Sequence, residues 1–252
     1  MRVLVIIPTY NEAESLPPII RRVRNAVPDA DVLVVDDASP DGTGEIADCI
    51  ADGDGQVSVL HRAGKEGLGR AYIAAFRLAM ERAYTHVVEM DADGSHRPEQ
   101  LPLLLERAAM SDRPDLVIGS RYVRGGETVG WPKSREALSR AGNLYVRLWL
   151  GVPVQDITAG YRVYRVAMLQ RLDLDSVEST GYFFQTDMTD RVNQLGGHIV
   201  EMPISFAQRE AGESKLSGAV FTESLSRATK MGLRRRGGQL KAFGQSIRRK
   251  LK

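Results

Sequence analysis

The stretch Thr85-His-Val-Val-Glu-Met-Asp-Ala-Asp-Gly94 joins an apolar run to a pair of carboxylates. The run has the length and composition of a buried strand, and open α/β sheets bind their ligands at the carboxyl ends of such strands. Asp91 and Asp93 are therefore predicted to leave the sheet at a ligand-binding crevice. The alternative is a polar turn in which Ser95 caps the helix that follows.

Two carboxylates separated by one residue suit a hard divalent cation. Mg²⁺ and Mn²⁺ prefer oxygen ligands, keep several waters and share their remaining positions with the phosphates of a substrate. Asp91 and Asp93 thus predict a magnesium or manganese site and a diphosphate substrate. An Asp-x-Asp pair is not specific by itself, so the turn alternative stays open at this point.

Apolar runs and helical patterns alternate along the chain. Runs suited to buried strands cover residues 2–7, 31–35, 57–60, 86–90 and 116–119, and a last strand is expected at 199–206. Helices are expected from Leu16 to Val27 and over residues 43–51, 68–82, 98–110, 134–150, 166–171, 184–195 and 219–233. This βαβ series predicts an α/β fold with a Rossmann-like, mostly parallel central sheet flanked by helices.

The 252 residues are 43% hydrophobic, which fits one large globular domain. We expect that domain at residues 1–229 and a separate basic tail at 230–252. The single cysteine, Cys49, excludes an intrachain disulfide and is expected in the core. No apolar stretch approaches the ~20 residues of a membrane span, and the apolar start is too short for a signal peptide, so a cytoplasmic protein is expected.

The tail differs in charge from the rest of the chain. Residues 230–252 hold nine basic residues and no acidic one, while the whole chain carries only +2. Leu240, Phe243, Ile247 and Leu251 recur at helical spacing among these cations. The pattern is typical of an amphipathic segment on an anionic membrane surface, which we expect here rather than nucleic acid. A solvated terminus without fixed structure is the alternative.

Polar residues also follow the first two predicted strands, in Pro8-Thr-Tyr-Asn-Glu12 and Val35-Asp-Asp37. Neither segment is the Gly-rich loop of a dinucleotide-binding oxidoreductase. Tyr10 can lie against a nucleobase, and Glu12 or Asp37 can accept hydrogen bonds from base or ribose groups. Asp36 is expected to form the turn instead. Lys65, in a Gly-rich turn before a helix, is expected to attract an anion.

Seven motifs occur in the order seen in family 2 glycosyltransferases, and the sequence most closely resembles the polyprenol-phosphate (dolichol-phosphate) mannose synthases. Together they span residues 1 to about 220, which is far more specific than one motif. They are Pro8-Thr-Tyr-Asn-Glu12, Val35-Asp-Asp37, Gly67-Leu-Gly69, Asp91-Ala-Asp-Gly94, Gly119-Ser-Arg-Tyr122, Asp156-Ile-Thr-Ala-Gly-Tyr-Arg162 and Gly212-Glu-Ser-Lys215.

The resemblance implies a GT-A fold, a GDP-mannose donor and a set of site residues. The implied nucleoside-site residues are Pro8, Tyr10, Glu12, Val35 and Asp37. Asp91 and Asp93 are implied at the metal and diphosphate, and Ser95 stands where some members carry a glutamine near the metal. The implied phosphate-binding cations are Arg121, Arg135 and Lys215.

The segment Tyr182-Phe-Phe-Gln-Thr-Asp187 occupies the place where many inverting family members carry an acidic catalytic residue. Asp187 is therefore a catalytic candidate, and Gln185 is expected to contact substrate. A lipid phosphate needs no protein base, because its second pKa of ~6 leaves it ionised near neutral pH. The alternatives for Asp187 are to orient a mannose hydroxyl, to pair with an arginine, or to lie on a helix surface.

These features predict a metal-dependent, inverting transfer of mannose from GDP-mannose to a polyprenyl monophosphate. Because no membrane-spanning helices follow the domain, attachment at the cytosolic membrane face is expected through the tail or a separate membrane-spanning partner. A glucose transfer from UDP-glucose to the same lipid would use the same charges. A catalytically silent membrane-binding module and a phosphohydrolase with Asp91 as nucleophile are two further possible functions.

Overall fold

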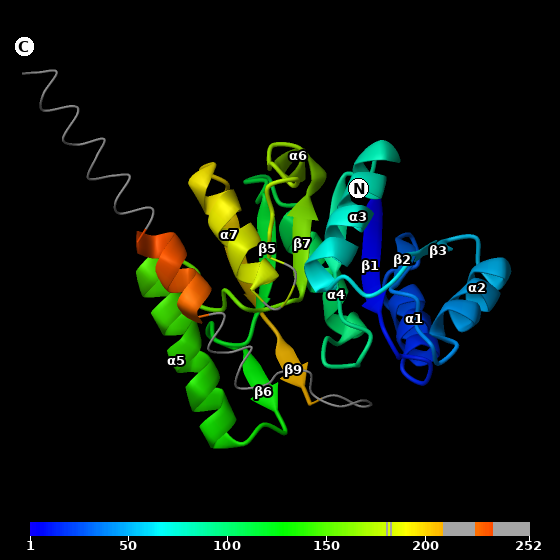
Figure 1. Cartoon of the computed structure of the whole chain (residues 1–252), viewed down its shortest axis with the longest axis horizontal. Coiled ribbons are helices and arrows are strands. Elements are labelled where there is room, and N and C mark those ends of the chain that lie inside the picture. The colour runs from blue at the N-terminus through cyan, green and yellow to red at the C-terminus, as the bar shows by residue number, and fades with distance from the viewer. Residues whose placement is uncertain (180, 182, 209–224, 234–252) are drawn as a thin grey trace, which may run out of the picture.

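The computed structural model describes residues 1–179, 181, 183–208 and 225–233. Its central sheet has seven strands in the order β3-β2-β1-β4-β7-β5-β8 (Figure 1). The strands are β1 Val3–Thr9, β2 Asp31–Asp36, β3 Val57–His61, β4 His86–Glu89, β5 Leu116–Ser120, β7 Arg162–Arg165 and β8 Ile199–Pro203. Neighbours are parallel except at β7, which runs antiparallel to β4 and β5. The prediction of an α/β fold with a mostly parallel sheet is confirmed.

Helices lie on both faces of the sheet (Figure 1). They are α1 Leu16–Ala26, α2 Thr43–Gly53, α3 Leu68–Glu81, α4 Leu101–Ala108, α5 Lys133–Leu150, α6 Val166–Leu169 and α7 Phe184–Gln194. A 3₁₀ turn, η1 (Pro98–Gln100), precedes α4, and residues 225–233 are helical.

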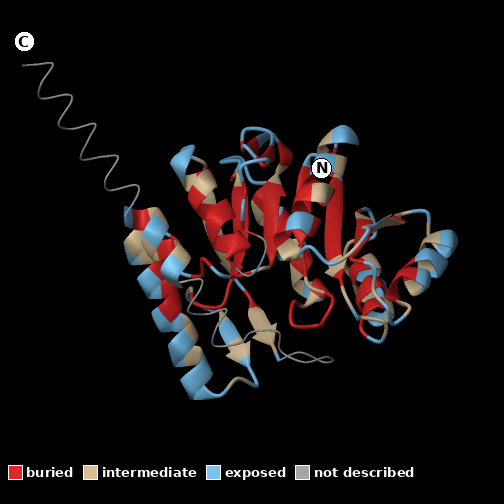
Figure 2. Cartoon of the chain, viewed as in Figure 1, coloured by how far each residue is buried: buried red, intermediate tan, exposed pale blue. Residues whose placement is uncertain are grey.

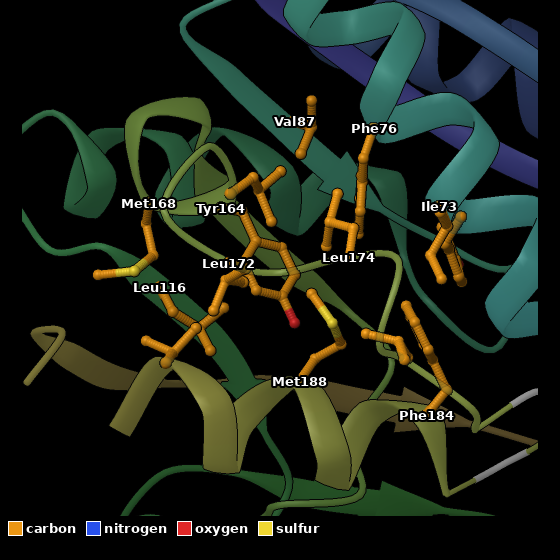
Figure 3. Packing of buried hydrophobic residues seen from close by; sticks show 14 of the residues in the cluster. Ile73, Phe76, Val87, Leu116, Tyr164, Met168, Leu172, Leu174, Phe184 and Met188 are labelled. Carbon is orange, nitrogen blue, oxygen red and sulfur yellow. The ribbon is translucent and has the colours of Figure 1, made fainter. Parts of the chain in front are cut away.

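Alternate residues of the strands point to opposite faces, so the sheet separates two apolar clusters. On one face Phe76 of α3 packs 5.7 Å from Tyr164 of β7, ring centroid to ring centroid, close to Met188 of α7 (Figure 3). On the other face α1 and α4 cover the sheet through residues such as Ile19 and Leu104. The inner strands β1, β2, β4, β7 and β5 are accordingly buried almost throughout, whereas the edge strands β3 and β8 are mostly half-buried (Figure 2).

Three strands differ from the sequence-based expectation. β7 was not predicted, because its four residues Arg-Val-Tyr-Arg carry charge at both ends and form no apolar run. The expected strand at 199–206 is divided at Ile204, whose amide donates to the Ser120 carbonyl at 3.0 Å. Beyond this break β9 (Ser205–Ala207) pairs in parallel with another unpredicted strand, β6 (Glu127–Val129).

The core position expected for Cys49 is wrong, because its side chain is exposed. Helix α2 buries Thr43, Gly44 and Ala47, which form its inner face, and Cys49 lies outside that face. No helix in the described ranges is long and apolar enough to cross a bilayer.

The tail prediction falls mostly outside the described residues, which include neither Lys215 nor the apolar stripe from Leu240 to Leu251. The helical stretch 225–233 runs across the expected boundary between residues 229 and 230. It packs on α5, where the Tyr145 and Thr229 hydroxyl oxygens lie 2.7 Å apart. The boundary stays a prediction.

The antiparallel strand β7 decides where the predicted site residues emerge. Because β7 opposes both β4 and β5, those two strands run in the same direction. Their carboxyl ends therefore lie at the same edge of the sheet. Asp91 and Asp93 follow β4, and Arg121 follows β5, so the carboxylates and the cation leave the sheet on one side.

Candidate active site

A cavity of about 340 Å³ opens at this edge of the sheet. Its walls come from the loop after β4, one side of α5 between Arg135 and Val146, residues 158–160, the start of α7 and residues 204–208. The residues of the predicted site that line it are Asp91, Asp93, Ser95, Arg121, Arg135 and Gln185. One cavity thus holds both predicted carboxylates and two predicted phosphate-binding cations.

The loop after β4 holds Asp93 by local hydrogen bonds. Asp93 is 4% exposed, and its Oδ1 accepts the Ser95 backbone N–H at 3.0 Å and the Ser95 hydroxyl at 2.6 Å. Gly94 between them has φ +77°, a conformation that glycine adopts without steric cost. The hydroxyl of Ser95 therefore orients the Asp93 carboxylate, and this contact replaces the helix cap considered from the sequence.

His96 fixes the backbone at Asp91. Its Nδ1 lies 3.0 Å from the Asp91 amide nitrogen and accepts that N–H, so in this arrangement the neutral ring carries its proton on Nε2. The ring is buried, stacks on Tyr161 with 5.0 Å between centroids, and meets the ring of Phe206 edge-on at 5.3 Å. The aromatic contacts thus hold the imidazole, and the imidazole holds the start of the acidic loop.

The donor set fits a hard divalent cation that is shared with a substrate. Asp91 and Asp93 both line the cavity, and the Asp91 side chain is 36% exposed there. Among the described residues no group of three or more His, Cys, Asp or Glu side chains is placed to hold a metal. Mg²⁺ and Mn²⁺ do not need one when waters and a diphosphate supply the other ligands. Ser95 stays a predicted ligand.

Arg121 is held by a buried carboxylate. Its Nε lies 2.7 Å from Asp156 Oδ2, its Nη2 lies 2.6 Å from Asp156 Oδ1, and Nη2 also donates to Thr158 Oγ1 at 3.0 Å. Asp156 is fully buried, and Arg121 is 7% exposed. This two-point contact fixes the direction in which the guanidinium meets the cavity.

Arg135 lies in a different environment, in the first turn of α5. Its guanidinium carbon lies 4.0 Å from the centre of the Trp131 ring, and the residue is exposed. The Trp131 ring in turn meets Phe206 edge-on at 5.6 Å. The cavity therefore has one buried, fixed cation and one exposed cation that rests on an aromatic ring.

A polar seam ties α5 to the opposite wall of the cavity. Asn143 Nδ2 donates to Thr158 Oγ1 at 3.1 Å, and Asn143 Oδ1 accepts the Thr158 N–H at 3.2 Å. One turn earlier, the Tyr122 hydroxyl donates to Ser139 Oγ at 2.6 Å. These contacts set the distance between the helix that carries Arg135 and the loop that holds Arg121.

The residues implied at the nucleoside site do not line this cavity. They lie at the ends of β1 and β2, where Thr9 pairs with Asp36 in register. Lys65 Nζ lies 3.9 Å from the centre of the Tyr10 ring. Glu12 Oε2 accepts the Ser15 hydroxyl at 2.7 Å. Pro8 is half-buried, and Val35 is fully buried within β2.

Asp36 and Asp37 take different roles. Asp36 accepts hydrogen bonds from the Thr9 hydroxyl at 3.0 Å and the Ser39 hydroxyl at 2.6 Å, which is the turn role expected for it. Asp37 is buried and pairs with Arg62. Burial raises the pKa of Asp37, and the Arg62 guanidinium offsets part of this rise.

Asp187 lies beside the cavity and not in its wall. Its Oδ2 accepts the Ser179 hydroxyl at 2.9 Å, and its Oδ1 accepts Arg191 Nε at 2.8 Å. The Asp187 side chain is 7% exposed. The geometry matches the arginine-pairing alternative for Asp187.

Two buried charged residues behind the cavity were missed from the sequence, Glu89 and Arg162. Arg162 donates to the Ala159 carbonyl at 2.6 Å and the Gln185 carbonyl at 2.8 Å, and so joins two walls of the cavity. Glu89, its neighbour across β4 and β7, is fully buried, and burial raises its pKa to about 8 against the opposing effects of Arg162 and Gln185. The sequence did contain a signal for Glu89, because it is a charged residue within the apolar run of a predicted strand.

Comparison with known proteins confirms the family that the sequence motifs indicated. Residues 4–173 match the model of Glycosyl transferase family 2. The chain is 59% identical to undecaprenyl-phosphate mannosyltransferase from Micrococcus luteus, over 96% of this chain and 98% of that protein. It is 52% identical to polyprenol monophosphomannose synthase from Mycolicibacterium smegmatis, over 93% of this chain and 88% of that protein.

Solved structures share the fold at low sequence identity. Mannosyl-3-phosphoglycerate synthase from Rubrobacter xylanophilus superposes with a TM-score of 0.69 at 20% identity, over 94% of this chain and 75% of that one. Glucosyl-3-phosphoglycerate synthase from Mycobacterium tuberculosis, solved with Mn²⁺, UDP-glucose and phosphoglyceric acid, gives 0.65 at 20% identity, over 92% and 79%.

Proposed function

This chain belongs to Glycosyl transferase family 2, and we propose that it transfers mannose from GDP-mannose to the phosphate of a polyprenyl monophosphate. The observation that carries the activity is the 59% identity to an undecaprenyl-phosphate mannosyltransferase over nearly the whole of both chains. The product is a polyprenyl-phosphate-mannose, a lipid-linked sugar donor. GDP as the nucleotide, inversion at the sugar and dependence on a metal are the finer parts of the proposal.

The cavity supports this reaction by its distribution of charge. Asp91 and Asp93 would hold Mg²⁺ or Mn²⁺, which when bound neutralises the diphosphate of the leaving GDP. Arg121 and Arg135 line the same cavity and would attract the phosphate of the lipid. A phosphate oxygen of the lipid attacks the anomeric carbon of mannose while the bond from that carbon to GDP breaks. Lys215, outside the described residues, is proposed as a third cation.

The acceptor phosphate is proposed to attack without a protein base. Its second pKa of ~6 already supplies an ionised oxygen near neutral pH. Asp187 fits a supporting role better than a catalytic one, because both of its oxygens accept hydrogen bonds within the protein. Asp187 would hold the start of α7 against Ser179.

The acceptor is a membrane lipid, and the basic residues after position 229 give the chain a means to approach an anionic surface. We propose that the tail, alone or with a separate membrane-spanning partner, holds the enzyme at the cytosolic face of a membrane. Nucleic acid is not proposed as a partner.

Purified protein should be incubated with polyprenyl phosphate and radiolabelled GDP-mannose, UDP-glucose or UDP-mannose, with Mg²⁺, Mn²⁺ or excess chelator. Transfer of label to the lipid fraction from GDP-mannose alone is the expected result. Transfer from UDP-glucose instead would replace the proposed donor, and full transfer in chelator would remove the metal from the proposal. The stereochemistry of the product, measured by NMR, tests inversion.

A further inference from the structure

The ring of Trp131 lies against both arginines of the cavity. Its centre is 4.0 Å from the guanidinium carbon of Arg135 and 5.6 Å from that of Arg121. A cation within about 6 Å of a ring centre is attracted to the aromatic face. Trp131 is half-buried and lines the cavity together with the two arginines. One ring therefore adjoins both cations that are proposed to bind the acceptor phosphate.

The two arginines differ in what else holds them. Arg121 is buried and forms a two-point ion pair with Asp156. Arg135 is exposed, and no carboxylate in the described part of the chain forms an ion pair with it. The contact with Trp131 is therefore what directs the Arg135 guanidinium among the described residues.

An aromatic partner leaves an arginine in a different state from a carboxylate partner. A carboxylate accepts the N–H groups of the guanidinium and compensates its charge, as Asp156 does for Arg121. An aromatic face attracts the cation without compensating its charge and leaves the N–H groups at the guanidinium edge open. Arg135 thus keeps its charge and its donors for an anion, and a phosphate need not displace a carboxylate to reach them.

Trp131 is itself held from two directions. It lies between β6 and Pro132, the N-cap of α5, and a residue that precedes proline has a restricted backbone. The ring of Phe206 meets Trp131 edge-on at 5.6 Å and meets the ring of His96 edge-on at 5.3 Å. Because His96 accepts the backbone N–H of Asp91, a row of three rings connects the acidic loop to the first turn of α5.

We propose that Trp131 is a positioning residue for the acceptor, whose ring holds the Arg135 guanidinium for the lipid phosphate without compensating its charge. Arg121 supplies a fixed contact whose charge Asp156 compensates, and Arg135 supplies the uncompensated positive charge. The row of rings keeps Arg135 at a constant distance from the acidic loop. The inference rests on the proposed function, because it takes the cavity to receive a polyprenyl phosphate.

The test compares variants that remove or keep the aromatic face. Trp131→Leu removes this face and stays apolar, whereas Trp131→Phe keeps it. Trp149→Leu is the matched control, because Trp149 is the other tryptophan of the chain, belongs to the same helix α5 and does not line the cavity. Each substitution is made in wild type and in Arg135→Ala. The KM values for a short, water-soluble prenyl phosphate and for GDP-mannose are measured in all of them.

Trp131→Leu should raise the KM for the prenyl phosphate about threefold to thirtyfold, the size expected for one lost cation–π contact, and leave the KM for GDP-mannose unchanged. In Arg135→Ala the same substitution should change the KM for the prenyl phosphate less than about twofold, because the contact is already absent. Trp131→Phe should stay close to wild type, since an aromatic face remains. Trp149→Leu should match wild type for both substrates.

Tryptophan fluorescence follows binding without turnover. Trp149→Phe leaves Trp131 as the single tryptophan, so its emission reports the contact directly. Titration with the prenyl phosphate, without any sugar nucleotide, should change this emission, and the Kd from the titration should rise when Arg135→Ala is added. This assay does not depend on the sugar or the nucleotide. If the wild type does not transfer mannose, the proposed function is refuted, and the titration still decides the role of Trp131.

Three results would overturn the inference. An equal rise of both KM values in Trp131→Leu would indicate a general loss of structure. An equal effect of Trp131→Leu in wild type and in Arg135→Ala would show that Trp131 does not act through Arg135. An emission that stays constant while calorimetry detects binding of the prenyl phosphate would show that Trp131 does not adjoin the bound phosphate. A KM in Trp131→Phe as high as in Trp131→Leu would likewise contradict the role of the aromatic face.

Discussion

Arg121 and Asp156 form a two-point ion pair in which Nε and Nη2 lie 2.7 and 2.6 Å from the two carboxylate oxygens. Asp156 also anchors its own loop, since its backbone N–H donates to Glu201 Oε1 at 2.9 Å. The pair thus joins the end of β5 to the loop before β7. Its burial makes each partner dependent on the other, because a lone buried charge is costly.

We predict that Asp156→Asn lowers the free energy of unfolding by about 3–5 kcal/mol, the range for removing one partner of a buried pair. Denaturant unfolding measures the change. The exposed pair between Arg22 and Glu99 is the control. The substitution Glu99→Gln should lower the free energy of unfolding by less than about 1 kcal/mol. Similar losses in the two variants would mean that Asp156 does not hold Arg121 in solution.

Asp93→Asn should reduce mannose transfer on the order of a thousandfold or more, because Lewis-acid help to a leaving diphosphate is worth several kcal/mol. It should also weaken Mn²⁺ binding, measured by electron paramagnetic resonance in the presence of GDP. Asp112→Asn, at an exposed carboxylate paired with Arg107, is the control. Unchanged Mn²⁺ binding in Asp93→Asn would assign that carboxylate another role.

The acidic loop was predictable because its signal is local. An apolar run followed by Asp91 and Asp93 indicates a strand end, and parallel strands collect their ends at one edge of a sheet. Strand β7 has no such local signal, because it begins with a charged residue, Arg162. This arginine can be fully buried because it donates hydrogen bonds to the carbonyls of Ile157, Ala159 and Gln185. Only the tertiary structure supplies those partners.

The residues that α5 contributes to the cavity wall could not be predicted from the sequence for the same reason. The pattern predicted the helix over 134–150, close to the observed bounds. It could not show that Asn143 faces Thr158 or that Trp131 supports Arg135, because these contacts join segments whose relative placement depends on the whole fold. Local periodicity predicts an element, and packing decides which of its residues enter a site.

The raised pKa of Glu89 predicts a dependence of stability on pH. Its pKa rises from 4.5 to about 8 on folding, so between these values the folded state binds more protons than the unfolded state. The contribution of Glu89 to the free energy of unfolding is therefore fully present below pH 4.5. It falls as the pH rises toward 8, by up to about 1.4 kcal/mol per pH unit.

Glu89→Gln removes this titration, so its free energy of unfolding relative to wild type should increase steadily from about pH 5 to about pH 8. Chemical denaturation at several pH values measures the difference, in which the other titrating groups cancel. Parallel curves for the two proteins would show that Glu89 ionises in the folded state as it does in the unfolded chain.

Arg135→Ala should impair capture of the lipid phosphate more than capture of the donor, because the donor diphosphate is also held at Asp91 and Asp93. We expect the KM for polyprenyl phosphate to rise about tenfold to a hundredfold, as for loss of a charged hydrogen bond, with little change for GDP-mannose. Arg147→Ala, in the last turn of the same helix, is the control. An equal rise in both KM values would place Arg135 at the donor.

Removing the residues after Leu233 tests the proposed role of the tail while it keeps the helical stretch 225–233. The deleted segment carries eight of the nine basic residues, and each cation near an anionic surface contributes about 1 kcal/mol before screening. The truncated protein should therefore fail to float with anionic vesicles and should still transfer mannose to a short, water-soluble prenyl phosphate. Salt should weaken binding of the full chain, since surface attraction falls off within a Debye length of about 8 Å at physiological ionic strength.

A second variant separates charge from the apolar stripe in the tail. Replacing Leu240, Phe243, Ile247 and Leu251 by serine keeps every cation, so electrostatic attraction alone predicts unchanged flotation at low salt. An amphipathic helix predicts weaker flotation at every salt concentration, because its apolar face no longer enters the headgroup region. If the truncated protein floats as well as the full chain does, the tail is not the attachment, and the membrane contact must be sought in residues 1–233 or in a separate partner.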